Sequence, residues 1–187
     1  MGAVSGLKDI TLSLRSIDMK FAYGGLAFNQ KPRLRQIVPG YFLGETIQGS
    51  IETVLDIIAD KLPEPEPLMP ADSYQKALSQ FRERQALIET HVWGAFIATN
   101  KPTRYLAKIN YDIGQIIDAA LNLGDMSLLE TDIIWIEYLL TGYRPPRQFI
   151  IDYLQAYHQG TKIHLGESAP MILDWFSQLL SEKSETE

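Results

Sequence analysis

The spacing of apolar residues is the strongest constraint on this chain, because they recur every three or four positions along most of its 187 residues. Residues at this spacing share one face of an α-helix, so each run predicts an amphipathic helix. We expect helices over residues 45–61, 73–98, 103–123, 127–141, 147–158 and from 168 onward. No succession of βαβ units is evident, and the sequence therefore predicts an all-α protein.

Capping residues set several expected helix boundaries. Asp72 suits an N-cap, and Gly124 suits the C′ position after a helix. Residues 127–130 (Ser-Leu-Leu-Glu) match a capping box that opens a nearly apolar helix. Ser168 is expected to cap the last helix, with Pro170 in its first turn.

The first seventy residues are less regular. Residues 9–17 fit either a helix or a strand, the Tyr23-Gly-Gly25 segment breaks the chain, and residues 30–39 are expected to form a loop. Four of the ten prolines lie between Pro63 and Pro70. Proline cannot continue a helix, so residues 62–72 are expected to form an extended loop, with a linker between domains as the alternative. We predict one domain over residues 1–187, with an N-terminal extension (1–40) and a flexible tail (182–187).

Composition excludes several classes of function. The chain carries 17 Lys and Arg against 23 Asp and Glu, a formal net charge of −6, which gives no electrostatic footprint for nucleic acid or anionic membranes. It has no cysteine, so it forms no disulfide and no thioether bond to a chromophore. No apolar run approaches the ~18 residues of a membrane span, and no secretory signal is evident. We therefore expect a cytoplasmic protein without a transmembrane segment.

Three stretches in order carry a resemblance to a known family. Residues 47–60, residues 104–125, and residues 128–157 followed by 167–180 cover roughly two thirds of the chain. Together they resemble the phycobiliproteins, the globin-like subunits of cyanobacterial light-harvesting antennae (phycobilisomes). The resemblance implies a globin-like helical bundle, in which residues 47–60 correspond to a core helix and residues 104–125 to the chromophore-bearing helix. Bacterial stress-sensor domains with a globin-like bundle but no haem are a competing resemblance.

The chromophore helix of that family carries a Cys-x-Arg-Asp motif, from which this chain departs. Counting back from Gly124, Leu106 stands in place of the bilin-bonding cysteine, Lys108 in place of the arginine and Ile109 in place of the aspartate. The resemblance therefore implies that no bilin is covalently attached. Asp112, one turn further along the same face, is a candidate replacement for the missing carboxylate.

A non-covalent ligand site is the next expectation. Arg104 and Lys108 are one turn apart and suit the carboxylate of a bilin or a fatty acid. Tyr111 belongs to a set of aromatic residues concentrated after residue 90, and Leu106 and Asp112 complete the candidate site. The alternatives without a ligand are solvated cations on a helix face and aromatic residues packed in a core.

No motif indicates catalysis or metal binding. His91 is the best haem candidate but has no second histidine placed as a distal partner, and His158 and His164 suit surface positions. No Gly-x-Ser-x-Gly elbow and no phosphate-binding loop is present. We expect no catalytic residue, no metal ligand and no enzymatic activity.

Two hypotheses about function remain. The first is an interaction or assembly module related to light-harvesting antennae, whose N-terminal helices pair with a partner as a homodimer or hetero-oligomer. The second is a sensor domain that binds a bilin or fatty acid in a cleft beside Leu106, Lys108 and Asp112.

Overall fold

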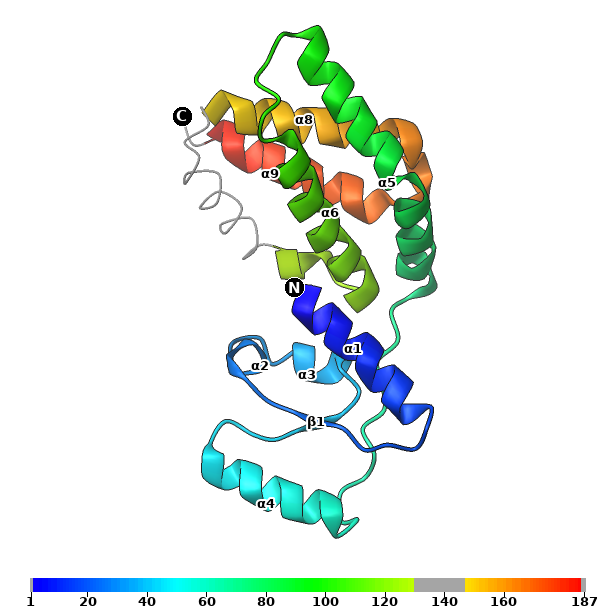
Figure 1. The fold of residues 1–187 in the computed structure, drawn as a ribbon, viewed down its shortest axis with the longest axis vertical. Helices are drawn as coiled ribbons and strands as arrows, with labels where there is room; N and C mark the ends of the chain where they lie inside the picture. Colours follow the sequence, from blue (N-terminus) through cyan, green and yellow to red (C-terminus); the bar gives the residue numbers. More distant parts are fainter. Residues whose placement is uncertain (1, 130–146, 186–187) are drawn as a thin grey trace. The chain divides into compact units, whose positions relative to one another are not determined.

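The computed structural model describes residues 2–129 and 147–185. Over these residues the chain is mostly α-helical, which confirms the all-α prediction (Figure 1). The globin-like arrangement stays a prediction. The chain divides into two compact units, an N-terminal unit (residues 3–69) and a C-terminal unit (from residue 70 onward), and each is described by itself. The prediction of a single domain is not tested by this division.

The N-terminal unit contains four helices and two short strands within its described residues. They are α1 (Gly2–Arg15), β1 (Ala22–Tyr23), α2 (Leu26–Gln30), α3 (Leu34–Ile37), β2 (Tyr41–Phe42) and α4 (Ile47–Ile58). Residues 9–17, for which the sequence allowed a helix or a strand, are therefore helical as far as Arg15. The prediction of an unbroken loop over residues 30–39 is wrong, because α3 forms just after Pro32, whose fixed φ suits the start of a helical turn.

A small aromatic cluster lies at the centre of this unit. The two strands pair in parallel, with Tyr23 beside Phe42. The rings of Tyr23 and Phe28 lie 4.5 Å apart, and the Arg35 guanidinium lies 4.1 Å over the Phe42 ring. The Tyr23 hydroxyl donates a hydrogen bond to the Arg35 carbonyl at 3.1 Å, so its polar atom is satisfied although the side chain is buried.

Helix α4 begins at a capped residue and ends before the Pro-rich segment. The Thr46 hydroxyl accepts a hydrogen bond from the Gly49 amide, which stabilises the first turn. Asp60, which follows the C-cap residue Ala59, adopts a positive φ of 56°. Residues 62–70 then form neither helix nor strand, as expected, and Arg15 contacts this segment by donating to the Pro65 carbonyl at 2.7 Å.

The C-terminal unit is a bundle of long helices. Its described elements are α5 (Asp72–Ala98), α6 (Leu106–Leu123), the 3-10 turn η1 (Met126–Leu129), α8 (Arg147–His164), η2 (Gly166–Ser168) and α9 (Pro170–Glu185). Helix α5 packs against α6 and α8, and α8 packs against α9 (Figure 1). Their apolar stripes form one core, which includes Phe81, Ile88, Ile113, Ile117, Tyr157 and Phe176.

Helix α8 is six residues longer than predicted. The sequence suggested an end near His158, because Gly160 follows. In the structure Gly160 lies inside the helix against α5, and an added Cβ would lie 3.3 Å from atoms of Ile88 and His91. The glycine therefore permits close approach of two helices instead of ending one.

Two predicted caps, Asp72 and Ser168, differ in the structure, and the Ser127 capping box lies partly outside the described residues. Asp72 is the first residue of α5, and Ala71 occupies the N-cap position without a side-chain hydrogen bond. Asp125, not Ser127, caps the turn η1, because its carboxylate accepts from the Ser127 amide at 3.0 Å and hydroxyl at 2.7 Å. The Ser168 hydroxyl donates back to the Leu165 carbonyl. Glu130 and most of the helix predicted over 127–141 lie outside the described residues.

Gly124 ends α6 as predicted, and its substitution tests the conformation found there. Its φ is 76°, and an added Cβ would lie 2.9 Å from the Pro70 Cβ. We expect Gly124→Ala to lower the free energy of unfolding by about 1–3 kcal/mol, measured by urea denaturation. Gly94 is the matched control, because it is helical with open space around it, so Gly94→Ala should raise that free energy by about 0.5–1 kcal/mol. Equal effects of the two substitutions would contradict the left-handed conformation.

Tyr23 predicts a pH dependence of stability. Burial raises its pKa to about 12, against about 10 in an unfolded chain. The folded state therefore keeps a proton that the unfolded state loses, so stability is unaffected below pH 10 and falls between about pH 10 and 12. Tyr23→Phe should show a smaller loss of unfolding free energy between about pH 8 and pH 11.5, by on the order of 1–3 kcal/mol. An unchanged difference between these pH values would contradict the burial of the phenol.

Candidate functional site

The predicted ligand site lies at the start of α6, and the structure brings only part of it together. The Lys108 ammonium and the Asp112 carboxylate form an ion pair of 2.5 Å across one helical turn. Lys108 also lies 5.7 Å from the centre of the exposed Tyr111 ring. The Arg104 guanidinium lies 4.4 Å over the Tyr105 ring, outside the helix. Leu106 is fully buried in the core, so it does not lie on a surface shared with Lys108 and Tyr111.

The ion pair decides what this patch can bind. A ligand carboxylate at Lys108 would have to displace Asp112, whose negative charge offsets that of the ammonium. The Lys108 side chain is 56 % exposed and that of Asp112 only 12 %, and i, i+4 pairs on helix surfaces contribute about 0.3–0.5 kcal/mol to stability. The geometry is therefore that of an intrahelical salt bridge beside an aromatic ring, whereas the alternative that the sequence left open was two solvated cations on a helix face.

A buried polar cluster inside the C-terminal unit is a feature that the sequence analysis missed. Asn110 is 1 % exposed, and its side-chain oxygen accepts a hydrogen bond of 2.8 Å from the Tyr153 hydroxyl. Tyr157 lies one turn along α8 from Tyr153. Within residues 2–129 and 147–185, neither the Tyr157 hydroxyl nor the Asn110 amide nitrogen has a hydrogen-bond partner. The signal in the sequence was Asn110, which interrupts an otherwise apolar face.

Burial fixes the protonation state of this cluster. It raises the pKa of both Tyr153 and Tyr157 well above the usual range, and for Tyr153 the nearby Tyr157, Glu89 and Asp112 add to the rise. Both phenols are therefore neutral hydrogen-bond donors at physiological pH. Such groups can orient a buried polar atom, but the cluster offers no ionised nucleophile or base.

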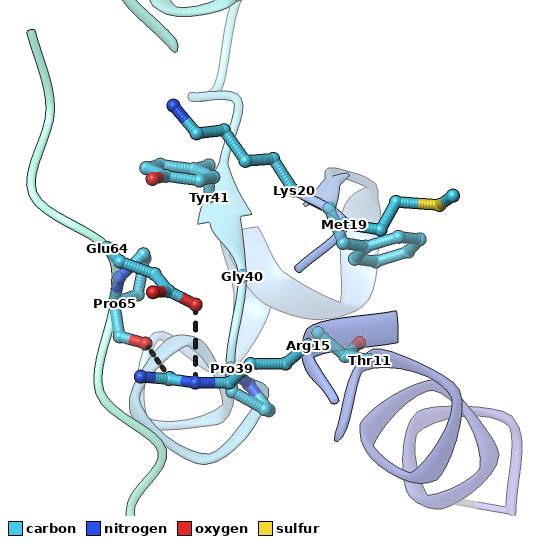
Figure 2. Close-up of a pocket in the computed structure, with 10 residues that line it drawn as sticks. Thr11, Arg15, Met19, Lys20, Pro39, Gly40, Tyr41, Glu64 and Pro65 are labelled. Atoms are coloured by element: carbon cyan, nitrogen blue, oxygen red, sulfur yellow. Dashed lines mark hydrogen bonds and ion pairs between the residues drawn. The ribbon is translucent and has the colours of Figure 1, made fainter. Parts of the chain in front are cut away.

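A small pocket lies in the N-terminal unit between α1, the strand region and the Pro-rich segment (Figure 2). Two cations line it, and both are paired: Arg15 with Glu64 at 3.2 Å, and Lys20 with Asp60 at 2.5 Å. The cavity volume of about 10 Å³ is that of a single water molecule. This pocket cannot hold a bilin or a fatty acid.

The apolar face of α4 is the most unusual surface of the described residues. Five aliphatic side chains, which we name the α4 stripe, follow one face of the helix and are exposed: Ile47 (83 %), Ile51 (52 %), Val54 (38 %), Leu55 (60 %) and Ile58 (76 %). The resemblance implied that residues 47–60 form a core helix. Along the described length of α4, Ile57 alone is buried.

The covered side of α4 is instead polar or small. Gly49, Ser50, Thr53 and Asp56 are half-buried beside Ile57. The hydroxyls of Ser50 and Thr53 donate to backbone carbonyls one turn earlier in the helix, at 2.8 and 2.9 Å. Their hydrogen bonds are thus satisfied within α4, and the helix keeps its polar side covered while its aliphatic side meets water.

The histidines make no metal centre in the part of the chain that is described. The rings of His91 and His164 lie 6.3 Å apart, but no group of three or more His, Asp or Glu residues is placed to hold an ion among the described residues. Over the same residues, no helix is both long enough and apolar enough to cross a bilayer.

The two tyrosines of the buried cluster give a matched pair of substitutions. Tyr153→Phe removes the partner of a buried amide oxygen and should lower the free energy of unfolding by about 1–3 kcal/mol. Tyr157→Phe removes a hydroxyl without a described partner and should change it by less than about 0.5 kcal/mol or raise it. Urea denaturation measures both. A loss for Tyr157→Phe as large as that for Tyr153→Phe would mean that the Tyr157 hydroxyl is hydrogen-bonded.

Comparisons with protein-family models, with curated proteins and with solved structures found no match. A function for this chain therefore has to be argued from its own residues.

Proposed function

We propose that this chain is a non-enzymatic interaction module that assembles with another protein surface through the α4 stripe. The observation that carries the proposal is the exposure of Ile47, Ile51, Val54, Leu55 and Ile58 on one face of a capped helix. Full burial of an aliphatic side chain of this size is worth roughly 1.5–3 kcal/mol. Contiguous apolar patches of this kind mark binding sites on soluble proteins more often than they mark plain surface.

Helix α4 is also already ordered in the absence of a partner. Its N-cap and its internal hydroxyl–carbonyl hydrogen bonds form without a partner, so little backbone order remains to be gained on association. This arrangement supports the first of the two sequence hypotheses, an assembly module whose N-terminal helices pair with a partner. The relation to phycobiliprotein-like assemblies and the cytoplasmic location remain part of the proposal, based on the resemblance and the composition.

The sensor hypothesis has weaker support. Lys108, its expected cationic anchor, is paired with Asp112, and Leu106, its expected apolar wall, is part of the core. A bilin or fatty acid would need a cavity of several hundred Å³, the size class of small-molecule sites. Among the described residues of the C-terminal unit, the buried polar atoms of Tyr157 and Asn110 without a hydrogen-bond partner favour a bound molecule.

A charge placed in the α4 stripe tests the proposal. We expect the chain purified from its natural source to be held in complexes of defined stoichiometry, and Ile51→Lys to lower the complexed fraction at least tenfold. The reason is that burying an unpaired ammonium costs several kcal/mol. Leu87→Lys is the matched control, because Leu87 of α5 is also 52 % exposed.

Native mass spectrometry measures the fraction of the chain that is held in complexes. Complexes that persist in Ile51→Lys, or a chain present only as a 21.2 kDa monomer, would refute the proposal. A mass a few hundred daltons above the chain, retained in Ile51→Lys, would favour the sensor hypothesis.

A further inference from the structure

The two edges of the α4 stripe differ in chemistry. Around the helix, Gln48 and Glu52 come next after Leu55 of the stripe, and both side chains are exposed. The opposite edge is the covered side of the helix, where Ser50 is half-buried and Ile57 is buried. A partner that covers the stripe therefore meets Gln48 and Glu52 along the exposed edge.

The acidic side chains in and around α4 differ in whether a cation offsets their charge. Three of them form ion pairs within the N-terminal unit: Glu45 with Arg35 (2.7 Å), Asp56 with Lys61 (3.0 Å) and Asp60 with Lys20 (2.5 Å). Among the described residues, Glu52 has one such contact, a long hydrogen bond of 3.4 Å from the neutral amide of Gln48. Its negative charge is therefore left without a cation, and it lies beside the apolar stripe.

Charge selects the kind of surface that fits this edge. Helix α4 contains no Lys or Arg, so an anionic lipid surface, which favours basic amphipathic helices, is a poor occupant. A second copy of the chain would bring the same carboxylate and a net charge of −6, and like charges oppose association. A groove with an apolar floor and a basic rim matches both features, because its floor covers the stripe and its rim pairs with Glu52.

From the exposed aliphatic face and the uncompensated carboxylate beside it, we infer that α4 docks in an apolar groove of a different protein, whose rim carries a Lys or Arg that pairs with Glu52. The inference rests on the proposed function of the stripe and names its class of partner. A charge on the rim of an interface affects association rate and choice of partner more than affinity. Glu52 is therefore a specificity-determining residue, and the stripe supplies most of the binding free energy.

Charge reversal at position 52 tests the inference. At low ionic strength, the fraction of the chain held in complexes should fall about tenfold for Glu52→Lys and about threefold for Glu52→Gln. Both differences should shrink in about 0.5 M salt, because salt screens a rim ion pair. Glu83→Lys is the matched control, since Glu83 is also exposed on a helix but belongs to α5. Circular dichroism should show unchanged helix content for all three variants.

A carbodiimide cross-link identifies the group that pairs with Glu52. The reagent joins a carboxylate directly to an amine in contact with it, so products within the chain, Asp60 with Lys20 and Asp56 with Lys61, are internal controls. In the native complex, mass spectrometry should find Glu52 joined to a lysine of a different protein. Where the rim carries an arginine, which the reagent does not join, the charge reversal decides. A product that joins Glu52 to a second copy of the chain would overturn the unlike partner.

The outcomes separate this inference from the proposed function. A complex that Ile51→Lys abolishes, but that neither Glu52→Lys nor salt weakens, would overturn the basic rim and leave the interaction module in place. A larger complexed fraction for Glu52→Lys than for the wild type would show an acidic rim and would also overturn it. Complexes that persist in Ile51→Lys, or a chain present only as a monomer, would overturn the proposed function and this inference together.

Discussion

Burial of aliphatic stripes along helices is the interaction on which this fold depends, and α4 is where it is left incomplete. In the C-terminal unit, Ile88 of α5, Ile117 of α6 and Phe176 of α9 are fully buried in one core. The same three- and four-residue spacing on α4 produces an exposed face. Aliphatic side chains that stay in water add nothing to the stability of the fold. The five residues of the α4 stripe therefore leave unused the stability that their burial would supply. This contrast between helices with the same spacing is the physical basis for our proposal that α4 is an interaction surface.

The helical class of the fold could be predicted from the sequence, because periodicity reports which residues share a face. The end of α6 was also predictable, since Gly124 adopts the left-handed conformation that its residue type favours. Periodicity does not show whether the apolar face of a helix packs against another element or meets water. The exposure of α4 and the continuation of α8 through Gly160 both depend on residues far away in the sequence. At position 160 a glycine is needed because Ile88 of α5 approaches closely.

In the candidate site, too, contacts within one helix could be predicted and contacts between distant residues could not. The Lys108–Asp112 pair lies within one helical turn, so the i, i+4 spacing could have predicted it, although the sequence analysis placed both residues in a ligand site instead. The contact of Tyr153 with Asn110 joins residues 43 positions apart, so no local pattern could have found it. Leu106 was placed beside a cleft from its correspondence to a chromophore-bonding position, and in the structure its aliphatic side chain packs in the core.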